Sequence, residues 1–461
     1  MNRAGQLSIL VAALLLGACA DISMPDYRRP DTPVKAAWTR PSAADVIAPD
    51  WWKGFGDPTL DRLVDSAIAG NIDVKILAAR IQVAQATIGE VQAGALPTVG
   101  LGGGVDVRKV TGQAPTRQYS LGTQVAWDLD VWGQVAKGVQ AQKAQYRASE
   151  ADWRAGYLTM VADVSTTYFQ MLQFDEQIDQ QQQTLDKSQQ ILRILEEMEI
   201  NGLLPKTRVL QQRAEINRLS NDLLELRRSR DISVNALASL LGTPAGELKM
   251  APGHLQDRVR LPSVPAGLPS QLLKRRPDVV AAELRVLEAY DLVGQAKLAQ
   301  LPSISLTGQG GSSSFALGNL LRTFTFGLAP SINIPLLDPG VKARIKTSQA
   351  QVRVAEESYR KAVITAFEEV ENALVNLEAH KKQRLELTQQ IEHLRTVAGQ
   401  VDGQLREGLV SQLEVFESQR SLLAAQLALL ANHQQLLSDT VTFYKALGGG
   451  WPSVDVAQAA R

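Results

Sequence analysis

The fold follows from one stretch, Tyr119-Ser120-Leu121-Gly122-Thr123-Gln124-Val125-Ala126-Trp127-Asp128-Leu129, in which large, mostly apolar side chains alternate with small or polar ones. Such alternation places the two sets on opposite faces of a strand, one suited to lipid and the other to water. About ten tilted residues suffice to cross the hydrocarbon layer of a membrane. We therefore predict a membrane strand here, with Tyr119, Leu121, Val125 and Trp127 facing lipid.

A second stretch, residues 323–334, repeats this pattern and predicts that Phe324, Phe326 and Leu328 face lipid. Partner strands are expected after each Leu-Pro, with tips at residues 109–117 and 310–319. Four strands leave two open edges, which cannot remain in lipid, so other copies of the chain must complete the sheet. Two copies would give eight strands and three would give twelve, and only a larger barrel leaves a substantial water channel. The alternative is a half-exposed sheet of a periplasmic domain.

Residues 116–204, 206–243 and 340–451 contain no proline, although the chain has 20, so long uninterrupted helices can form within these stretches. Apolar residues there recur with a period of 3.5, as in the series Val363, Phe367, Val370, Leu374 and Leu377. Residues 134–200 would form a rod about 100 Å long. Gly202-Leu203-Leu204-Pro205 and Gly408-Leu409-Val410-Ser411 are expected to turn each rod back into a return helix. Shorter helices are expected before the strands, with breaks at Asn71 and Pro277.

The chain is predicted to be a tandem duplication, because motifs in its two halves match at an offset of 205 or 206 residues. Leu96-Pro97-Thr98 matches Leu301-Pro302-Ser303, and Leu241-Gly242 matches Leu447-Gly448. The expected organisation is a signal peptide at 1–18, a lipid-anchored arm at 19–58, a first repeat at 59–242, an equatorial linker at 243–268, a second repeat at 269–448 and a tail at 449–461.

The N-terminus predicts export and lipid attachment. Arg3 precedes an apolar run too short to span a bilayer, and Leu16-Gly17-Ala18-Cys19 resembles a bacterial lipobox. Cys19 is the only cysteine, so it would carry lipid and no disulfide can form. Ala20 follows it, where Asp would indicate retention in the inner membrane. The mature chain is expected in the outer membrane, lipid-anchored and extending into the periplasm.

Other classes of protein fit the sequence poorly. The 48 basic residues balance 48 acidic ones, so nucleic acid is not an expected partner. The four histidines lack metal-ligand spacing, and the glycine-rich residues 100–104 open a strand, so we expect no enzyme, cofactor or metal site. A lipid-anchored periplasmic coiled-coil protein is the structural alternative, but it would not need paired amphipathic strands.

Several motifs resemble the outer membrane factor family, the TolC-like ducts, and specifically its NodT-type lipoprotein branch. They are Asp50-Trp51-Trp52-Lys53-Gly54-Phe55-Gly56-Asp57-Pro58, Trp127-Asp128-Leu129-Asp130-Val131-Trp132-Gly133, Arg275-Arg276-Pro277-Asp278, Pro335-Leu336-Leu337-Asp338, Gln419-Arg420 and Lys445-Ala446-Leu447-Gly448-Gly449-Gly450-Trp451. The resemblance implies an α+β membrane protein, a homotrimer whose 12-stranded outer-membrane β-barrel continues into a 12-helix periplasmic α-barrel. It also implies a passive exit duct for drugs or other small molecules, served by a periplasmic adaptor (membrane fusion protein) and an inner-membrane RND-type pump. A type I-like protein secretion duct is the alternative within the family.

The resemblance further implies a periplasmic gate at Leu413, Glu414 and Glu417, just after the second hairpin turn. Carboxylates three residues apart share one helix face, and three copies around an axis would attract cations. The family often has Asp where this chain has Glu, which changes the diameter of the ring. The matching residues of the first repeat are Thr207, Arg208 and Gln211, so an acidic ring would be threefold.

Overall fold

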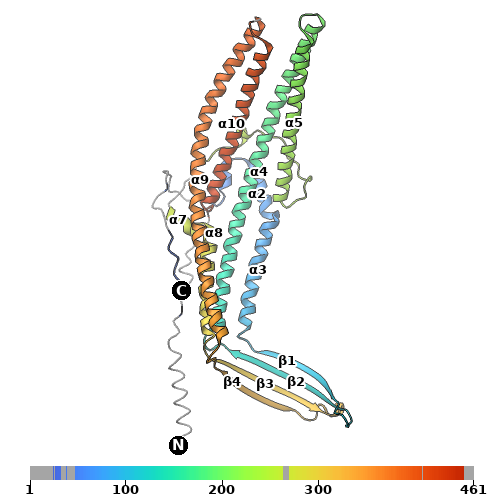
Figure 1. The fold of residues 1–461 in the computed structure, drawn as a ribbon, viewed down its shortest axis with the longest axis vertical. Coiled ribbons are helices and arrows are strands. Elements are labelled where there is room, and N and C mark those ends of the chain that lie inside the picture. The colour runs from blue at the N-terminus through green and yellow to red at the C-terminus, as the bar shows by residue number, and fades with distance from the viewer. Residues whose placement is uncertain are drawn as a thin grey trace.

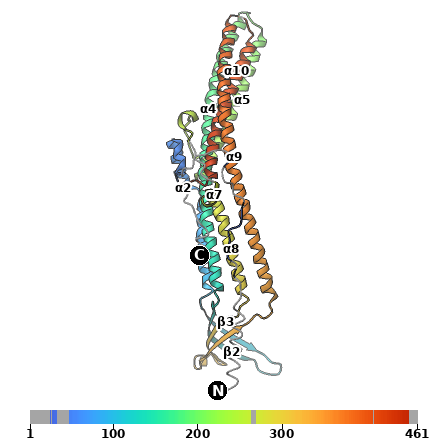
Figure 2. The ribbon, with the colours of Figure 1, turned by 90° about the vertical axis from the view of Figure 1, so that its left-hand side faces the viewer.

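The computed structural model describes residues 24, 26–32, 38, 47–262, 269–407 and 409–450. Two helical hairpins run side by side away from a sheet that lies at one end of the molecule (Figure 1). In the view turned by 90°, the two hairpins overlap, so the helical part is a slab with the sheet at its foot (Figure 2). Within the described residues, no helix is both long and apolar enough to cross a membrane.

The two halves contain the same elements in the same order. The first half contains α2 (Pro58–Gly70), α3 (Ile72–Ala93), β1 (Thr98–Arg108), β2 (Thr116–Leu129), α4 (Gln134–Ile200) and α5 (Lys206–Leu240). The second half contains α7 (Pro269–Arg275), α8 (Pro277–Leu298), β3 (Ser303–Ser314), β4 (Thr325–Asn333), α9 (Pro339–Arg406) and α10 (Gln412–Ala446). Three short elements are η1 (Trp51–Phe55), α6 (Leu255–Arg258) and η2 (Leu317–Asn319). The duplicated architecture, the two rods and the helix breaks near Asn71 and Pro277 are confirmed.

Two predicted details of the second hairpin are wrong. Residues 310–314 were expected in its tip, but they extend β3, and the connection to β4 is residues 315–324. The run Gly310-Gly311-Ser312-Ser313-Ser314 has the composition of a turn, yet β2 supplies it with a complete set of ladder partners. Phe324 lies just before β4 rather than within it, because the strand begins at Thr325.

The short helices complete the slab by stacking end to end. α3 packs on the part of α4 near the sheet, and α5 packs on its far part, while α8 and α10 do the same for α9 (Figure 1). Each half therefore contributes two helical columns at every height. One column is a continuous helix, and the other is made of two pieces.

The joint between α5 and α3 is closed by a side chain. The amide of Asn71 donates from Nδ2 to the carbonyl of Leu240 at 2.8 Å, and its Oδ1 accepts from the N–H of Val74 at 3.0 Å. Asn71 thus caps the start of α3 and satisfies the end of α5. Gly70 and Gly242 let the backbones meet, because a Cβ on Gly70 would lie 2.1 Å from the carbonyl oxygen of Leu241.

The matching joint between α10 and α8 uses a buried arginine. Nη1 of Arg276 donates to the carbonyl of Ala446 at 3.1 Å and to Glu369 on α9 at 2.6 Å. Its Nε and Nη2 donate to the two oxygens of Asp278 at 2.9 and 2.6 Å. Burial alone would raise the pKa of the Asp278 carboxyl, but the hydrogen bonds and charge of Arg276 outweigh it, so this pKa lies below its usual value.

The main buried core cluster includes the tryptophan-rich segment, which packs on the helices. Trp51 stacks on Tyr444 of α10 with ring centroids 4.8 Å apart, and Phe55 packs on Phe169 of α4 at 5.0 Å. The hydroxyl of the buried Tyr168 donates to Asp57 at 2.6 Å. These contacts attach the N-terminal segment to both hairpins.

Replacing Arg276 with Gln tests the second joint. The change removes a buried cation shared by two carboxylates, and we expect it to lower the free energy of unfolding by about 1–3 kcal/mol near pH 7. The loss should shrink in acid, because a carboxylate with a depressed pKa contributes its stability above its unfolded pKa and loses it as pH falls through the folded pKa. Urea titration of the detergent-solubilised protein, followed by circular dichroism, measures both effects.

Arg285→Gln is the matched control, because Arg285 lies on α8, which Arg276 precedes as the N-cap residue, and pairs with Asp152 at a more exposed site. Its expected cost is below about 1 kcal/mol. Equal costs for the two variants would contradict the role given to Arg276.

Candidate membrane sheet and periplasmic tip

The four strands form one antiparallel sheet in the order β1-β2-β3-β4. Their register places the apolar residues of all strands on one face: Val99 is opposite Val125, Trp127 is opposite Leu306, and Gly308 is opposite Leu328. The large residues of this face are Val99, Leu101, Val105, Val107, Tyr119, Leu121, Val125, Trp127, Leu129, Ile304, Leu306, Phe326, Leu328, Pro330 and Ile332. Two of them, Leu101 and Phe326, are 75% and 81% exposed, so the isolated chain leaves this face uncovered.

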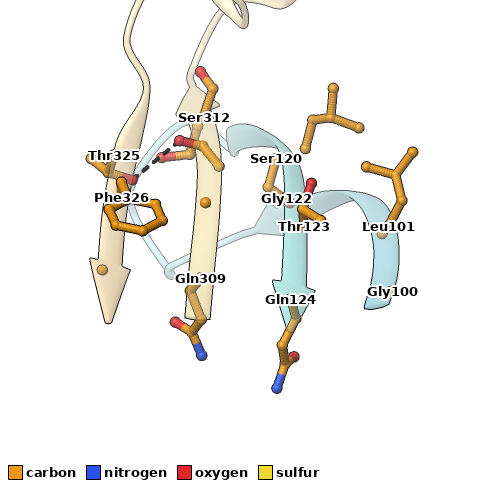
Figure 3. A pocket seen from close by; sticks show the side chains of 16 residues that line it. Gly100, Leu101, Ser120, Gly122, Thr123, Gln124, Gln309, Ser312, Thr325 and Phe326 are labelled. Atoms are coloured by element: carbon orange, nitrogen blue, oxygen red, sulfur yellow. Dashed lines mark hydrogen bonds between the residues drawn. The ribbon is translucent and has the colours of Figure 1, made fainter. Parts of the chain in front are cut away.

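The opposite face is lined by small and polar side chains. Gln124 is opposite Gln309, Gly122 is opposite Gly311, and Ser120 is opposite Ser313. An open hollow of about 850 Å³ lies among strands β1 to β4 at this level (Figure 3). The sheet therefore has one side that suits lipid and one that suits water.

In the part of the chain that the structure describes, each outer strand is paired on one side only. β1 pairs with β2, and β4 pairs with β3. The free edges carry backbone N–H and C=O groups that need partners wherever water is excluded.

Tryptophans and a carboxylate build the junction between sheet and helices. The indole N–H of Trp127 donates to the carbonyl of Ala95 at 2.8 Å, and that of Trp132 donates to the carbonyl of Pro302 at 2.7 Å. Asp130 accepts from the N–H groups of Val135 and Ala136 in the first turn of α4. Indoles with an apolar body and a hydrogen-bonded tip are typical of a membrane–water interface. The alternation in the sequence predicts that Trp127 faces lipid, whereas sequence reasoning assigned no role to Asp130 or Trp132.

The N-terminal arm is held by a buried carboxylate. Glu283 of α8 is 1% exposed and binds Arg29 through two hydrogen bonds, at 2.6 and 2.8 Å, and the hydroxyl of Tyr27 at 2.7 Å. Burial and the hydrogen bond to Glu283 raise the pKa of Tyr27, so its hydroxyl remains a donor. Cys19, the predicted lipid site, lies outside the described residues.

The predicted gate residues lie at the end of the molecule farthest from the sheet, where α10 begins (Figure 1). Leu413, Glu414 and Glu417 are all exposed. Oε1 of Glu414 accepts from the backbone N–H of Ser411 at 3.2 Å and from its hydroxyl at 3.0 Å. Glu414 therefore forms part of a capping box at the start of α10, a role that the Ser-x-x-Glu spacing indicates and that sequence reasoning missed.

The fold and the sheet define a class of protein. A two-faced strand sheet continues into helical rods, and the 67 residues of α4 alone span about 100 Å. Among the described residues, no group of three His, Cys, Asp or Glu side chains could hold a metal ion. The chain is a subunit of a membrane channel with a long helical extension.

Comparison with known proteins identifies the family. The family model described as outer membrane efflux protein matches residues 63–243 and 268–449. The pyoverdine export outer membrane protein OpmQ of Pseudomonas aeruginosa is 30% identical to this chain. The alignment is 463 residues long, gaps included, and covers 97% of each chain. The probable efflux pump outer membrane protein TtgC of Pseudomonas putida is 31% identical to this chain. The alignment is 468 residues long, gaps included, and covers 96% of this chain and 95% of TtgC.

A solved structure agrees. The open state of the MtrE outer membrane channel of Neisseria gonorrhoeae superimposes with a TM-score of 0.83 at 27% identity, covering 93% of this chain and 98% of that chain. The chain belongs to the outer membrane efflux protein family, and it is an outer-membrane efflux channel protein.

Proposed function

We propose that three copies of the chain close into one duct, through which small molecules leave the periplasm and cross the outer membrane. The observation that carries this proposal is the two-faced sheet with both edges unpaired. Three sheets of four strands give a twelve-stranded barrel in which every edge finds a partner, with the apolar face toward lipid. The two columns of each half give twelve columns below it, so the barrel continues into a helical tunnel.

The partners follow from the chemistry of the duct. A water-filled tube supplies no energy, so solutes pass through the duct passively. The energy for export must come from a pump in the inner membrane. We assign this role to an RND-type pump joined to the duct by a periplasmic adaptor. TtgC, named as an efflux pump outer membrane protein, and OpmQ, named for pyoverdine export, support small molecules as the cargo.

The arm supports a lipid anchor at Cys19, as in the lipoprotein branch of the family. Asp31 accepts from Arg360, and Trp38 packs on Phe367 farther along α9, so the arm approaches the sheet as residue numbers fall. Tyr27 is eight positions after Cys19, a stretch of chain that spans at most about 27 Å when extended. Glu283 lies fifteen residues before the end of α8, about 22 Å along the helix. Cys19 can thus reach the junction of helices and sheet, where lipid headgroups would lie.

The tip supports a threefold gate. Glu414 and Glu417 lie three residues apart on one exposed face of α10, and Leu413 beside them is 56% exposed. The matching start of α5 carries Arg208 and no acidic residue at these positions. Three copies would therefore place six carboxylates around the axis, with Leu413 narrowing the opening.

Light scattering on the detergent-extracted protein, with the detergent mass subtracted, tests the duct. We expect a trimer, because four strands per chain leave two edges to be paired. The trimer should also form water-filled channels in planar bilayers. A stable monomer would contradict the shared barrel and leave a lipid-anchored periplasmic rod.

Mass spectrometry of the mature N-terminus tests the anchor. We expect the wild-type chain to begin with a lipid-modified Cys19, and the Cys19→Ser variant to lack that mass. An unmodified N-terminus in the wild type would end this part of the proposal.

The gate is tested by replacing both Glu414 and Glu417 with Gln. Gln can still accept from the backbone of Ser411, so the capping box and the start of α10 are preserved while the charge is removed. We expect cation selectivity in planar bilayers to fall, seen as a reversal potential closer to zero in a salt gradient. Glu407→Gln, just beyond the end of α9, is the control. Unchanged reversal potentials in the double variant would remove both residues from the gate.

A further inference from the structure

The water-facing side of the sheet has one row of long side chains in its centre. The register aligns Gly100, Gln124, Gln309 and Gly327 across the four strands. The next row toward the tips consists of Gly102, Gly122, Gly311 and Thr325, and the next row toward the helices consists of Thr98, Ala126, Thr307 and Ala329. Two amides thus project from the centre of this face, where both neighbouring rows carry only glycine, alanine and threonine. Longer side chains return toward the strand ends, at Asp106, Arg108, Gln118 and Asp128.

The side-chain amides of Gln124 and Gln309 face the same hollow. Gln124 and Gln309 lie on neighbouring strands, and their side chains point the same way (Figure 3). Both line the hollow on this face of the sheet. Among the described residues, neither amide is hydrogen-bonded to another group, so their donors and acceptors are free to meet a solute.

We infer that Gln124 and Gln309 form the narrowest level of the barrel and control which solutes cross it. The inference rests on the proposed trimer, in which three pairs would place six amides around the channel. Strands in a barrel tilt by about 35–45°, so the two members of a pair differ in height by about 3 Å and the six amides form a band.

The band defines the chemistry of the solutes that it favours. Its amides are uncharged and offer both donors and acceptors, so they select by size and hydrogen bonding rather than by charge. Charged side chains on this face lie only toward the ends of the strands, at Asp106, Arg108 and Asp128. Small, neutral or zwitterionic polar molecules should pass the band with little loss of hydration energy.

A thiol placed on the periplasmic side of the band tests this inference in intact cells. Asp128→Cys puts one on the same face, near the helical end of β2, and reagents added outside must pass the band to reach it. We expect a small maleimide to label it readily and a bulky polymer-coupled maleimide to label it slowly. Replacing both Gln124 and Gln309 with Ala should speed the bulky reagent by about threefold or more, because the lumen widens. The parent chain without the Asp128 substitution corrects for any reaction at Cys19.

The matched control replaces Ser120 and Ser313 with Ala, on the same strands and face but two rows away. We expect no change in either labelling rate. The band would be overturned if the bulky reagent labelled the chain at the same rate with and without the two amides. It would also be overturned if the serine control accelerated labelling as much as the double Ala variant does. Either result would leave a trimeric duct intact. Rapid labelling by the bulky reagent in every variant, together with a monomeric mass, would overturn the duct and the band together.

Charge substitution gives an independent readout. With Glu at both positions, an anionic thiol reagent should slow and a cationic one should speed up, each by about threefold or more. Rates that do not depend on reagent charge would show that solutes do not pass these side chains.

Discussion

Two hydrogen bonds to helix-terminal carbonyls hold the arrangement of this chain together. Asn71 closes the end of α5 at Leu240, and Arg276 closes the end of α10 at Ala446. Without these joints the last carbonyls of both return helices would lack partners inside the slab, and α3 and α8 would not be aligned with α5 and α10. Because the short helices are aligned, each half has two columns from tip to sheet. The strands therefore emerge together at one end, and both hairpin turns lie at the other.

Backbone N–H and C=O groups that are removed from water need hydrogen-bond partners, and at the membrane end this requirement is met differently. A helix end exposes a few carbonyls, which one side chain can satisfy. A strand edge exposes a whole row of donors and acceptors, and only another strand can pair it completely. Among the described residues, the outer edges of β1 and β4 have no strand partner, whereas the backbone of each helix is hydrogen-bonded within the helix itself. Closure of the sheet therefore has to come from association, and the helices follow because they are rigidly attached to it.

The periodic features of this fold could be predicted from sequence, whereas contacts between residues far apart in the chain could not. Alternation identified the strands, and proline-free seams identified α4 and α9, because both patterns are local. Residues 310–314 were misassigned because glycine and serine indicate a turn, whereas the deciding factor is pairing with β2, almost 200 residues earlier. Gln181 and Gln212 look like surface residues, but they are buried and donate to backbone carbonyls across the first hairpin. Glu283 meets Tyr27 and Arg29 across some 250 residues, and no spacing rule links them.

Duplication explains why packing repeats while functional features do not. The joint carbonyls of Leu240 and Ala446 match at an offset of 206, yet one accepts from a neutral amide and the other from an arginine that also holds Glu369. At the tips, Arg208 stands where the second repeat has Glu414. Gln124 and Gln309 are on β2 and β3, which occupy different places in their repeats. A duplicated backbone could give three copies an approximate sixfold symmetry, but these side chains reduce it to threefold. Packing therefore depends on what the repeats share, and the chemistry of the channel depends on where they differ.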